Sequence, residues 1–375
     1  MKSAAPLDGL KVVELARILA GPWAGQLLGD LGAEVIKVES PDGDDTRKWG
    51  PPFVDNADGS RDAAYFHAAN RGKRSVVANF SNDSDRAEVI ALIDEADIVI
   101  ENFKVGGLSR YGLDYATLSA RNPRLIYCSI TGFGQDGPYA ERPGYDFIAQ
   151  GMSGMMDLTG EPDRPPQKIG VALADIMTGL YAVVGIQAAL IERERSGCGQ
   201  QIDLALFDVM VGVLANQALN YLVSGVTPTR LGNAHPNIAP YEAFSSSNGW
   251  IIIAVGNDGQ FVKLCDILGL AEDPRFATNA SRIANRDVLR AAIAPVVASH
   301  DRDALLTLLE ARGVPAGPIN SVEQAFADPQ IVHRQLKLEL SREGDKDIPG
   351  VGPPLRFSRS ATRTGVPSPK LGSRT

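Results

Sequence analysis

The sequence contains few of the residues that build metal centres or disulfide frameworks. Its 375 residues include three cysteines and four histidines. None of them stands at a metal-binding or redox spacing such as C-x-x-C or H-E-x-x-H. Scattered cysteines of this kind indicate a reducing compartment and argue against structural zinc. We therefore expect no metal site.

The sequence also lacks an excess of positive charge. Lysine and arginine number 37 against 45 aspartates and glutamates, which gives a formal net charge of −8. A general nucleic-acid or anionic-membrane surface is therefore not expected. The N-terminal segment contains no apolar stretch of signal-peptide length, so we expect a cytoplasmic protein.

One long apolar run, residues 169–191, contains a single charged side chain, that of Asp175. Burying a lone ionised carboxylate costs several kcal/mol, so the group must be paired, protonated or used. One interpretation is a helix N-cap, since aspartate is a favoured cap and good helix formers follow. The other is a desolvated nucleophile or base at the mouth of a pocket. The two interpretations are compatible.

The same run is long enough to cross a bilayer as a helix. It carries an acid in its first third, three glycines and one aromatic residue, Tyr181. Those features, together with an overall composition of 44% hydrophobic and 22% charged residues, favour a buried core helix and no membrane association.

The first third of the chain alternates strand and helix patterns. Strands are expected at 10–15, 33–39, 74–80, 97–103 and 124–134, and helices at 21–32, 84–96 and 115–122. Successive strands joined by helices lie parallel, so this pattern predicts a doubly wound, Rossmann-like α/β domain.

The rest of the chain predicts a second domain. After a charged break at 192–200 we expect a strand at 201–206, one long helix at 207–223, an extended connector at 227–244 and a buried strand at 249–256. Residues 258–330 follow a helical pattern, and the proline-rich tail contains short extended pieces. The predicted large domain comprises 1–224 and 331–375, and a smaller α+β domain comprises 225–330.

Two local motifs suggest nucleotide binding. Gly132, Gly134 and Gly137 match G-x-G-x-x-G after a strand, but a proline-containing loop follows instead of a helix. Glu39 ends the second strand, where a ribose-binding acid would stand. An NAD-dependent dehydrogenase is therefore the alternative from another class. Two basic clusters, the run at 70–74 and Lys104 with Arg110, suit a small polyanion such as a nucleotide diphosphate, or are solvated charges.

Several longer segments resemble the family III CoA-transferases (CaiB/BaiF type), which include formyl-CoA transferase and carnitine CoA-transferase. They run in family order over nearly the whole chain. The matching segments are PLDGLKVVEL, AGPWAGQLLGDLGAEVIKVE, NRGKRSV, ENF with GGLSRYG, RLIYCSITGFGQDGPYAERPGYDFIAQGMSG, LADIMTG and RLGNAHPNIAPYEAF.

The resemblance implies roles for particular residues. The family nucleophile lies in a D-x-x-T/S-G segment, which here begins at Asp175. Ala20, Ala78, Asn102, Phe103 and Arg110 match positions that contact CoA, Tyr145 and Asp146 belong to the pocket, and Gly256 and Gly259 match a mobile loop that shields the intermediate.

The resemblance also implies the chemistry and the assembly. The family moves CoA from an acyl-CoA thioester to a free carboxylic acid through an aspartyl-CoA thioester and mixed anhydrides. Acyl-CoA and the acid are substrates, and no tightly bound cofactor is expected. The family fold is an interlocked homodimer, in which both termini close the Rossmann-like domain.

Two further alternatives share the fold. An α-methylacyl-CoA racemase needs a second proton-transfer group, and its motif has histidine where this sequence has Tyr145. A phenol with a pKa near 10 suits α-proton abstraction poorly, which favours the transferase. A non-catalytic acyl-CoA binding protein is disfavoured by the intact Asp175. The segment 230–241 resembles members acting on short dicarboxylic acids, and Leu19 replaces a glutamine of the formyl and oxalyl enzymes, which disfavours oxalate.

Overall fold

The computed structural model describes residues 4–342 and 344–373, which form two compact units. The first unit takes the described residues of 1–155, 169–214 and 329–375, and the second takes 156–168 and 215–328. The boundaries drawn from the sequence assigned 156–168 and 215–224 to the large domain. The loop 156–168 is tied to the second unit by Arg230, which donates to Asp157 Oδ1 at 2.8 Å, a long-range contact that no local pattern indicates.

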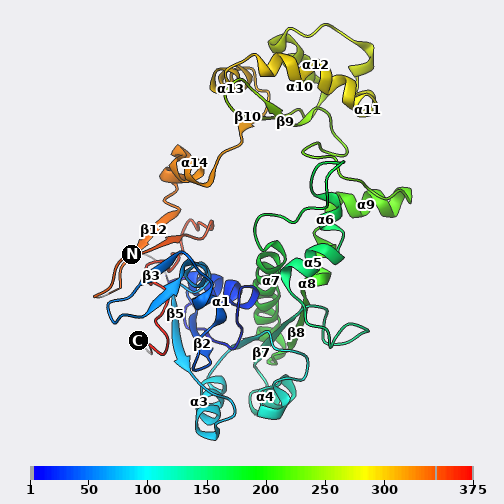
Figure 1. The fold of residues 1–375 in the computed structure, drawn as a ribbon. Coiled ribbons are helices and arrows are strands. Elements are labelled where there is room, and N and C mark those ends of the chain that lie inside the picture. Colours follow the sequence, from blue (N-terminus) through cyan, green and yellow to red (C-terminus); the bar gives the residue numbers. More distant parts are fainter. Residues whose placement is uncertain (1–3, 343, 374–375) are drawn as a thin grey trace. The chain divides into compact units, whose positions relative to one another are not determined.

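The first unit contains the elements that position the site (Figure 1). Its strands are β1 (Lys11–Glu14), β2 (Glu34–Glu39), β3 (Phe53–Asp55), β4 (Arg61–Ala63), β5 (Lys73–Val77), β6 (Ile98–Glu101), β7 (Ile126–Thr131), β8 (Gln201–Ala205), β12 (Lys337–Leu340) and β13 (Ile348–Val351). Its helices are α1 (Ala20–Asp30), α2 (Ala64–His67), α3 (Asp83–Asp94), α4 (Tyr115–Arg121), α5 (Asp146–Met152), α7 (Leu173–Ser196), α8 (Leu206–Gly212) and α15 (Pro329–His333), with short 3-10 helices η1 (Asp45–Lys48) and η2 (Ser109–Tyr111).

Six parallel strands form the main sheet in the order β5-β2-β1-β6-β7-β8. If only these six strands are numbered from 1 to 6 in chain order, the order across the sheet is 3-2-1-4-5-6, which is the Rossmann topology. The α/β class expected from the strand–helix alternation is confirmed. The strand order reverses between β1 and β6, and in such sheets ligands bind beyond the carboxyl ends of the strands at this point.

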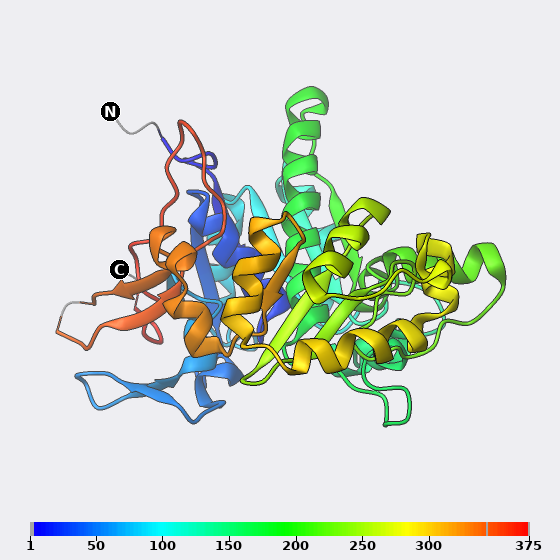
Figure 2. The ribbon, with the colours of Figure 1, turned by 90° about the horizontal axis from the view of Figure 1, so that it is seen from above.

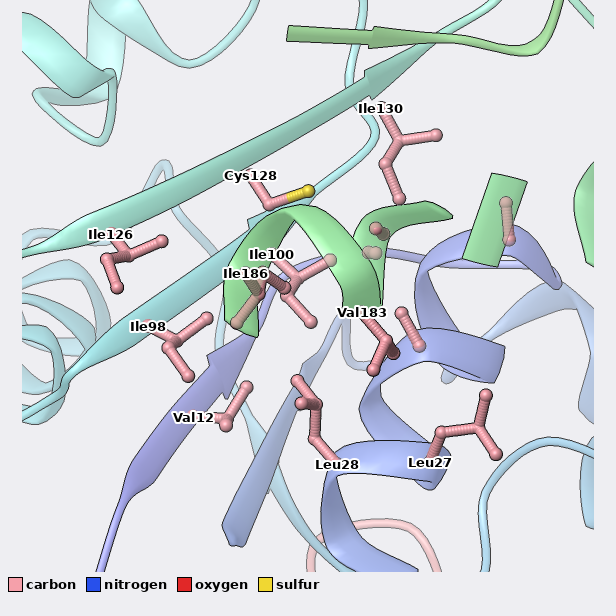
Figure 3. Packing of buried hydrophobic residues seen from close by; sticks show 14 of the residues in the cluster. Val12, Leu27, Leu28, Ile98, Ile100, Ile126, Cys128, Ile130, Val183 and Ile186 are labelled. Carbon is pink, nitrogen blue, oxygen red and sulfur yellow. The ribbon is translucent and has the colours of Figure 1, made fainter. Parts of the chain in front are cut away.

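Helices cover both faces of the sheet because successive strand residues point to opposite sides. Val12, Ile98 and Ile126 pack on one face with α1 and α7, and Figure 3 shows Leu28 and Val183 among these side chains. The next residues along the same strands, Val13, Val99 and Tyr127, pack on the other face with α3 and α4. Continuous apolar strands are typical of a sheet buried on both faces.

Helix α7 is long and apolar enough to cross a membrane by length and composition alone. It nevertheless packs a stripe of small and aliphatic side chains, including Ala182, Ile186 and Ala189, into the core against α1. The charged residues after 191 continue the helix, contrary to the expected break. Arg193 is buried and pairs with Asp97 at 2.9 Å, and the helix ends at Gly197 in the left-handed region (φ 77°).

The long helix expected at 207–223 is wrong. The structure has two helices, α8 and α9 (Ala215–Ser224), with Val213 and Leu214 between them. Ala215 adopts φ 48°, which a continuing helix does not allow. Gly212 is the last residue of α8 and is the local signal for the break, but the apolar pattern continues across it through Val213 and Leu214.

The C-terminal segment returns to the first unit, and Figures 1 and 2 both show it beside the N-terminal part of the sheet. Buried contacts hold it there. His67 Nδ1 lies 2.5 Å from Ser368 Oγ, the Gly372 N–H donates to Ser75 Oγ, and the Arg47 guanidinium donates to the Pro369 carbonyl.

The second unit has its own core. Its strands β9 (Tyr241–Ser245), β10 (Trp250–Ala254) and β11 (Ala316–Pro318) form an antiparallel sheet in the order β11-β10-β9. The connector expected at 227–244 thus ends in a strand. The other helices here are α10 (Asp258–Leu268), α11 (Asn279–Ala284), α12 (Arg286–Ala298), α13 (Arg302–Ala311) and α14 (Val322–Ala327), with η3 (Pro274–Phe276), while α6 (Met155–Leu158) spans a unit boundary.

Candidate active site

A cavity of about 650 Å³ lies beyond the carboxyl ends of β1 and β6, where the strand order reverses. All its lining residues belong to the first unit. Eight of the residues singled out from the sequence line it together: Ala20, Ala78, Asn102, Phe103, Arg110, Tyr145, Asp146 and Asp175. They come from five separate stretches of the chain, so the fold brings them to one place.

Asp175 lies in the first turn of α7, as the third helical residue. The N-cap residue is Ala172, so the interpretation of Asp175 as an N-cap is wrong. The side chain is half-buried in the cavity wall, and within residues 4–342 and 344–373 no hydrogen bond to its carboxylate is seen. Burial, with a smaller contribution from the charge of Asp146, raises the pKa of Asp175 to about 7.

Asp146 supplies the cap that α7 lacks in its own sequence. Its Oδ1 accepts hydrogen bonds from the backbone N–H groups of Ala174 at 2.7 Å and Asp175 at 3.3 Å. Its Oδ2 accepts from Gln150 Nε2 at 2.7 Å. A carboxylate at a helix N-terminus satisfies free N–H groups and interacts favourably with the helix dipole. Asp146 therefore fixes the first turn of α7 and places its own negative charge next to that turn.

A backbone crossing of two glycines places Asp146. A Cβ on Gly132, which follows β7, would lie 2.4 Å from the Gly144 Cα, and a Cβ on Gly144 would lie 2.1 Å from the Gly132 Cα. Only glycine permits so close an approach. Gly132 of the G-x-G-x-x-G motif thus serves this crossing, which leads directly to Tyr145 and Asp146, and no helix follows the motif before α5.

A third glycine sets the distance between α1 and α7. A Cβ on Gly179 would lie 2.8 Å from the Ala20 carbonyl oxygen and 3.0 Å from the Trp23 ring. Gly179 is one helical turn beyond Asp175, so both face α1. The D-x-x-T-G segment therefore combines the carboxylate with the glycine that brings the start of α1 against it.

The comparisons with known proteins agree on one family. Residues 7–375 match the family model described as CoA-transferase family III. A succinate–glutarate CoA-transferase of Agrobacterium fabrum is 58% identical over 372 residues, covering 98% of this chain and 93% of that protein. This chain is a family III CoA-transferase.

Further relatives extend the match. A human succinyl-CoA:glutarate CoA-transferase is 40% identical over 379 residues, covering all of this chain and 85% of that protein. A CaiB/BaiF family protein of Brucella suis superposes with a TM-score of 0.90 at 62% identity, covering 99% of this chain and 97% of that one. The family resemblance seen in the sequence is confirmed.

The cavity of this CoA-transferase also contains two cationic residues, Arg17 and Arg142, that the sequence did not single out. Arg17 and Arg142 line it together with Lys104 and Arg110. The Arg142 guanidinium stacks on the Tyr139 ring, 4.0 Å from its centroid. Arg142 stands four residues before Asp146, in the loop that the glycine crossing holds, and this proximity in the sequence is the only signal that could have indicated it.

The basic run at 70–74 does not face this cavity, and its nucleotide-diphosphate interpretation is wrong. Arg71 forms a buried ion pair with Asp30, fully buried Lys73 lies 2.8 Å from Glu14, and Arg74 pairs with Glu34. Glu39 lines the cavity, but its carboxylate is engaged by Arg47 at 2.7 Å, so it does not stand free as a ribose-binding acid.

Gly256 and Gly259 lie in the second unit, where Asn257 caps α10. Their role as a shielding loop stays a prediction. In the part of the chain that the structure describes, no group of three histidine, cysteine, aspartate or glutamate side chains is arranged to hold a metal ion.

Proposed function

We propose that this CoA-transferase moves CoA from an acyl-CoA such as succinyl-CoA to a short dicarboxylic acid, with Asp175 as the nucleophile. The observation that carries the proposal is the position of the Asp175 carboxylate in the cavity wall, without a hydrogen-bond donor among the described residues. A poorly solvated carboxylate is a stronger nucleophile than one in water. With a pKa of about 7, a large fraction of the group is ionised at neutral pH.

The first half-reaction releases the donor acid. An Asp175 carboxylate oxygen attacks the thioester carbon, and the carbon–sulfur bond breaks. CoA leaves as a thiolate, and a mixed anhydride between Asp175 and the donor acyl group remains. The thiolate then attacks the Asp175 carbonyl carbon, which forms aspartyl-CoA thioester and expels the donor acid. That acid carries away one oxygen from Asp175.

The second half-reaction repeats these steps in reverse. The acceptor carboxylate attacks the aspartyl thioester and releases CoA thiolate, and the thiolate attacks the acceptor carbonyl of the new anhydride. The products are acceptor acyl-CoA and an Asp175 carboxylate that now holds one acceptor oxygen. Charge and atoms balance without an external acid or oxidant.

The acceptor class is supported by the relatives named above and by the charge of the cavity. Both named enzymes carry glutarate in their names. Arg17, Lys104, Arg110 and Arg142 supply positive charge to the cavity wall, which suits CoA phosphates and an acid that keeps a second carboxylate ionised. We expect glutarate and succinate to accept CoA faster than oxalate or monocarboxylic acids of equal length.

We also propose that two copies assemble as the interlocked dimer typical of the family. Leu180, Tyr181, Val184 and Ile191 of α7 are exposed, and Val184 and Ile191 are each more than 60% exposed. An apolar helix face of this kind favours burial against a second copy. Interlocked chains do not separate without extensive unfolding, so sedimentation at nanomolar concentration should show dimers, and compact monomers would contradict the assembly.

The Asp175→Ala and Asp175→Asn variants test the nucleophile. Both should transfer CoA at below about one per cent of the wild-type rate while retaining CoA binding, because loss of a covalent nucleophile removes the reaction path. Asp83→Asn is the matched control, since Asp83 is also a first-turn acid but lies exposed on α3. Near wild-type transfer by Asp175→Asn would overturn the proposal. Rapid α-deuteration of a 2-methylacyl-CoA without an acceptor acid would favour the racemase instead.

A further inference from the structure

We propose that Asn102 and Asp44 are positioning residues that together hold the turn from Arg17 to Ala20 in a strained shape at the wall of the Asp175 cavity. The kinetic consequences rest on the proposed CoA transfer. The conformational consequences do not, because they concern the turn itself.

The strain lies at Ile18. This residue adopts φ 70°, in the left-handed region, and is one of three non-glycine residues in the described ranges with a positive φ. A β-branched side chain in this region is a genuine outlier, and such residues persist only where the surrounding structure holds them. Strained backbone of this kind concentrates at functional sites, and this turn lines the cavity.

Asn102 holds the turn from the end of β6. Its Oδ1 accepts from the Arg17 N–H at 2.9 Å, and its Nδ2 donates to the Arg17 carbonyl at 2.7 Å. The carboxamide thus pairs with both backbone groups of Arg17, as another peptide group would. The family resemblance assigns this position to CoA contact, but its side-chain donor and acceptor are directed to the turn.

Asp44 holds the next residue from the opposite side. Its carboxylate accepts from the Ile18 N–H at 3.2 Å and pairs with Lys37 Nζ at 2.9 Å. Lys37 also donates to the Ala16 carbonyl at 2.9 Å, so the same ion pair fixes the residues on both sides of Arg17. The Lys37 and Asp44 side chains are fully buried, and Asp44 is not among the residues lining the cavity.

The turn leads directly into α1 beside the nucleophile. Leu19 is the N-cap residue of α1, and Ala20 is its first residue. Ala20 packs closely against Gly179, because a Cβ on Gly179 would lie only 2.8 Å from the Ala20 carbonyl oxygen. Gly179 is one turn along α7 from Asp175. A relaxed Ile18 would displace this part of the wall, and displacements of about 1 Å at a reacting centre can lower rates by about 100-fold.

The competing explanation is that Asn102 acts only by touching CoA. Its loss would then weaken CoA binding and raise KM, and Asp44, which does not line the cavity, would have no effect of the same kind. If both residues hold one turn, either loss should release it, and the second loss should add little.

The experiment compares Asn102→Ala, Asp44→Asn and the double variant by steady-state transfer from succinyl-CoA to glutarate. Each single variant should lose roughly 10- to 100-fold in kcat, with KM for acyl-CoA within about threefold of wild type. The double variant should fall within about threefold of the worse single variant. Asn122→Ala is the matched control, because Asn122 also donates to a backbone carbonyl, that of Ala96, away from the cavity. It should leave kcat unchanged.

Hydrogen exchange gives a readout that does not depend on activity. The peptide spanning residues 15–24 should exchange faster in Asn102→Ala and in Asp44→Asn than in wild type, whatever reaction the enzyme catalyses. Wild-type exchange in both variants would overturn the positioning role, while faster exchange in a protein without CoA transfer would instead contradict the proposed function.

A second double-mutant cycle, between Asn102→Ala and Ile18→Gly, tests the proposal if Asp44→Asn fails to fold. Glycine adopts φ 70° without strain, so Asn102→Ala should lower kcat less in an Ile18→Gly background than in the wild type. An equal loss in both backgrounds, or multiplied losses in the Asn102→Ala/Asp44→Asn double variant, would overturn the proposal. So would a change confined to KM in Asn102→Ala.

Discussion

Asp146 Oδ1 accepts hydrogen bonds from the backbone N–H groups of Ala174 and Asp175, so one carboxylate caps the helix that presents the other. The cap orders the first turn of α7, and its negative charge raises the pKa of Asp175 in addition to the larger effect of burial. A single residue thus both caps the turn that carries the proposed nucleophile and raises the pKa of that carboxyl.

We predict that Asp146→Asn shifts the pH dependence of transfer. The wild-type kcat/KM should fall below a pKa of about 7 as Asp175 becomes protonated. Asparagine retains a capping oxygen but removes the charge, so the acid limb should move to lower pH, while burial keeps it above the ordinary carboxyl value. The measurement is the pH profile of kcat/KM for both proteins. An unmoved limb would show that Asp146 does not act on Asp175 through its charge.

We predict that Asp175→Asn stabilises the protein above neutral pH. The folded-state pKa of about 7 lies above the ordinary aspartate value of 3.8, so the folded protein binds this proton more tightly than the unfolded chain does. Wild-type stability therefore declines as pH rises from about 4 through 7, and the full penalty is present above pH 7. The variant lacks this penalty and should gain at most about 4 kcal/mol in free energy of unfolding at pH 8.

Urea denaturation at pH 5 and pH 8 checks this stability difference. The advantage of Asp175→Asn should shrink markedly at pH 5, where the wild-type carboxyl is protonated in the folded state. An advantage of the same size at both pH values would mean that desolvation of the charge is not its origin.

We predict opposite effects for two glycines of α7. A methyl group on Gly179 would meet the Ala20 carbonyl oxygen at 2.8 Å, so Gly179→Ala should push α1 and α7 apart and destabilise the first unit by about 2 kcal/mol. Gly185 has only Ile202 nearby, at 3.4 Å. Gly185→Ala should therefore be neutral or stabilise by up to ~1 kcal/mol, as expected for alanine in a helix. Thermal unfolding of the two variants gives the comparison, and equal destabilisation would contradict the close approach at Gly179.

The sheet was predictable from the sequence because its signal is local. The β-branched runs at 10–15 and 33–39 and the helix opened by Gly21 and Pro22 each lie within two residues of the observed elements. The break before Ala215 was missed because the apolar pattern continues through Val213 and Leu214, and Gly212 at the end of α8 was the one local signal. The positive φ of Ala215 itself is imposed by the surrounding structure.

The residues of the candidate site also divide into those with a local sequence signal and those that depend on contacts between distant parts of the chain. The isolated carboxylate of Asp175 indicated this cavity by its apolar sequence surroundings alone, whereas the positions expected to contact CoA came from the family resemblance. The partners of Arg71 and Lys73, which are Asp30 and Glu14, stand 41 and 59 residues away in the chain, so no local pattern indicated that these cations are buried in ion pairs. The hydrogen bonds between the Asn102 carboxamide and the Arg17 backbone were not predictable for the same reason, since 85 residues separate the two.

The most direct test of the account is the transfer of oxygen from the acceptor acid to Asp175. The enzyme is incubated with succinyl-CoA and with glutarate labelled with ¹⁸O in both carboxylates. It is then digested, and the mass of the peptide containing Asp175 is measured by mass spectrometry. Each turnover through the aspartyl thioester leaves one acceptor oxygen on Asp175, so the account predicts ¹⁸O in that side chain and in no other. Formation of glutaryl-CoA with no ¹⁸O at Asp175 would contradict it.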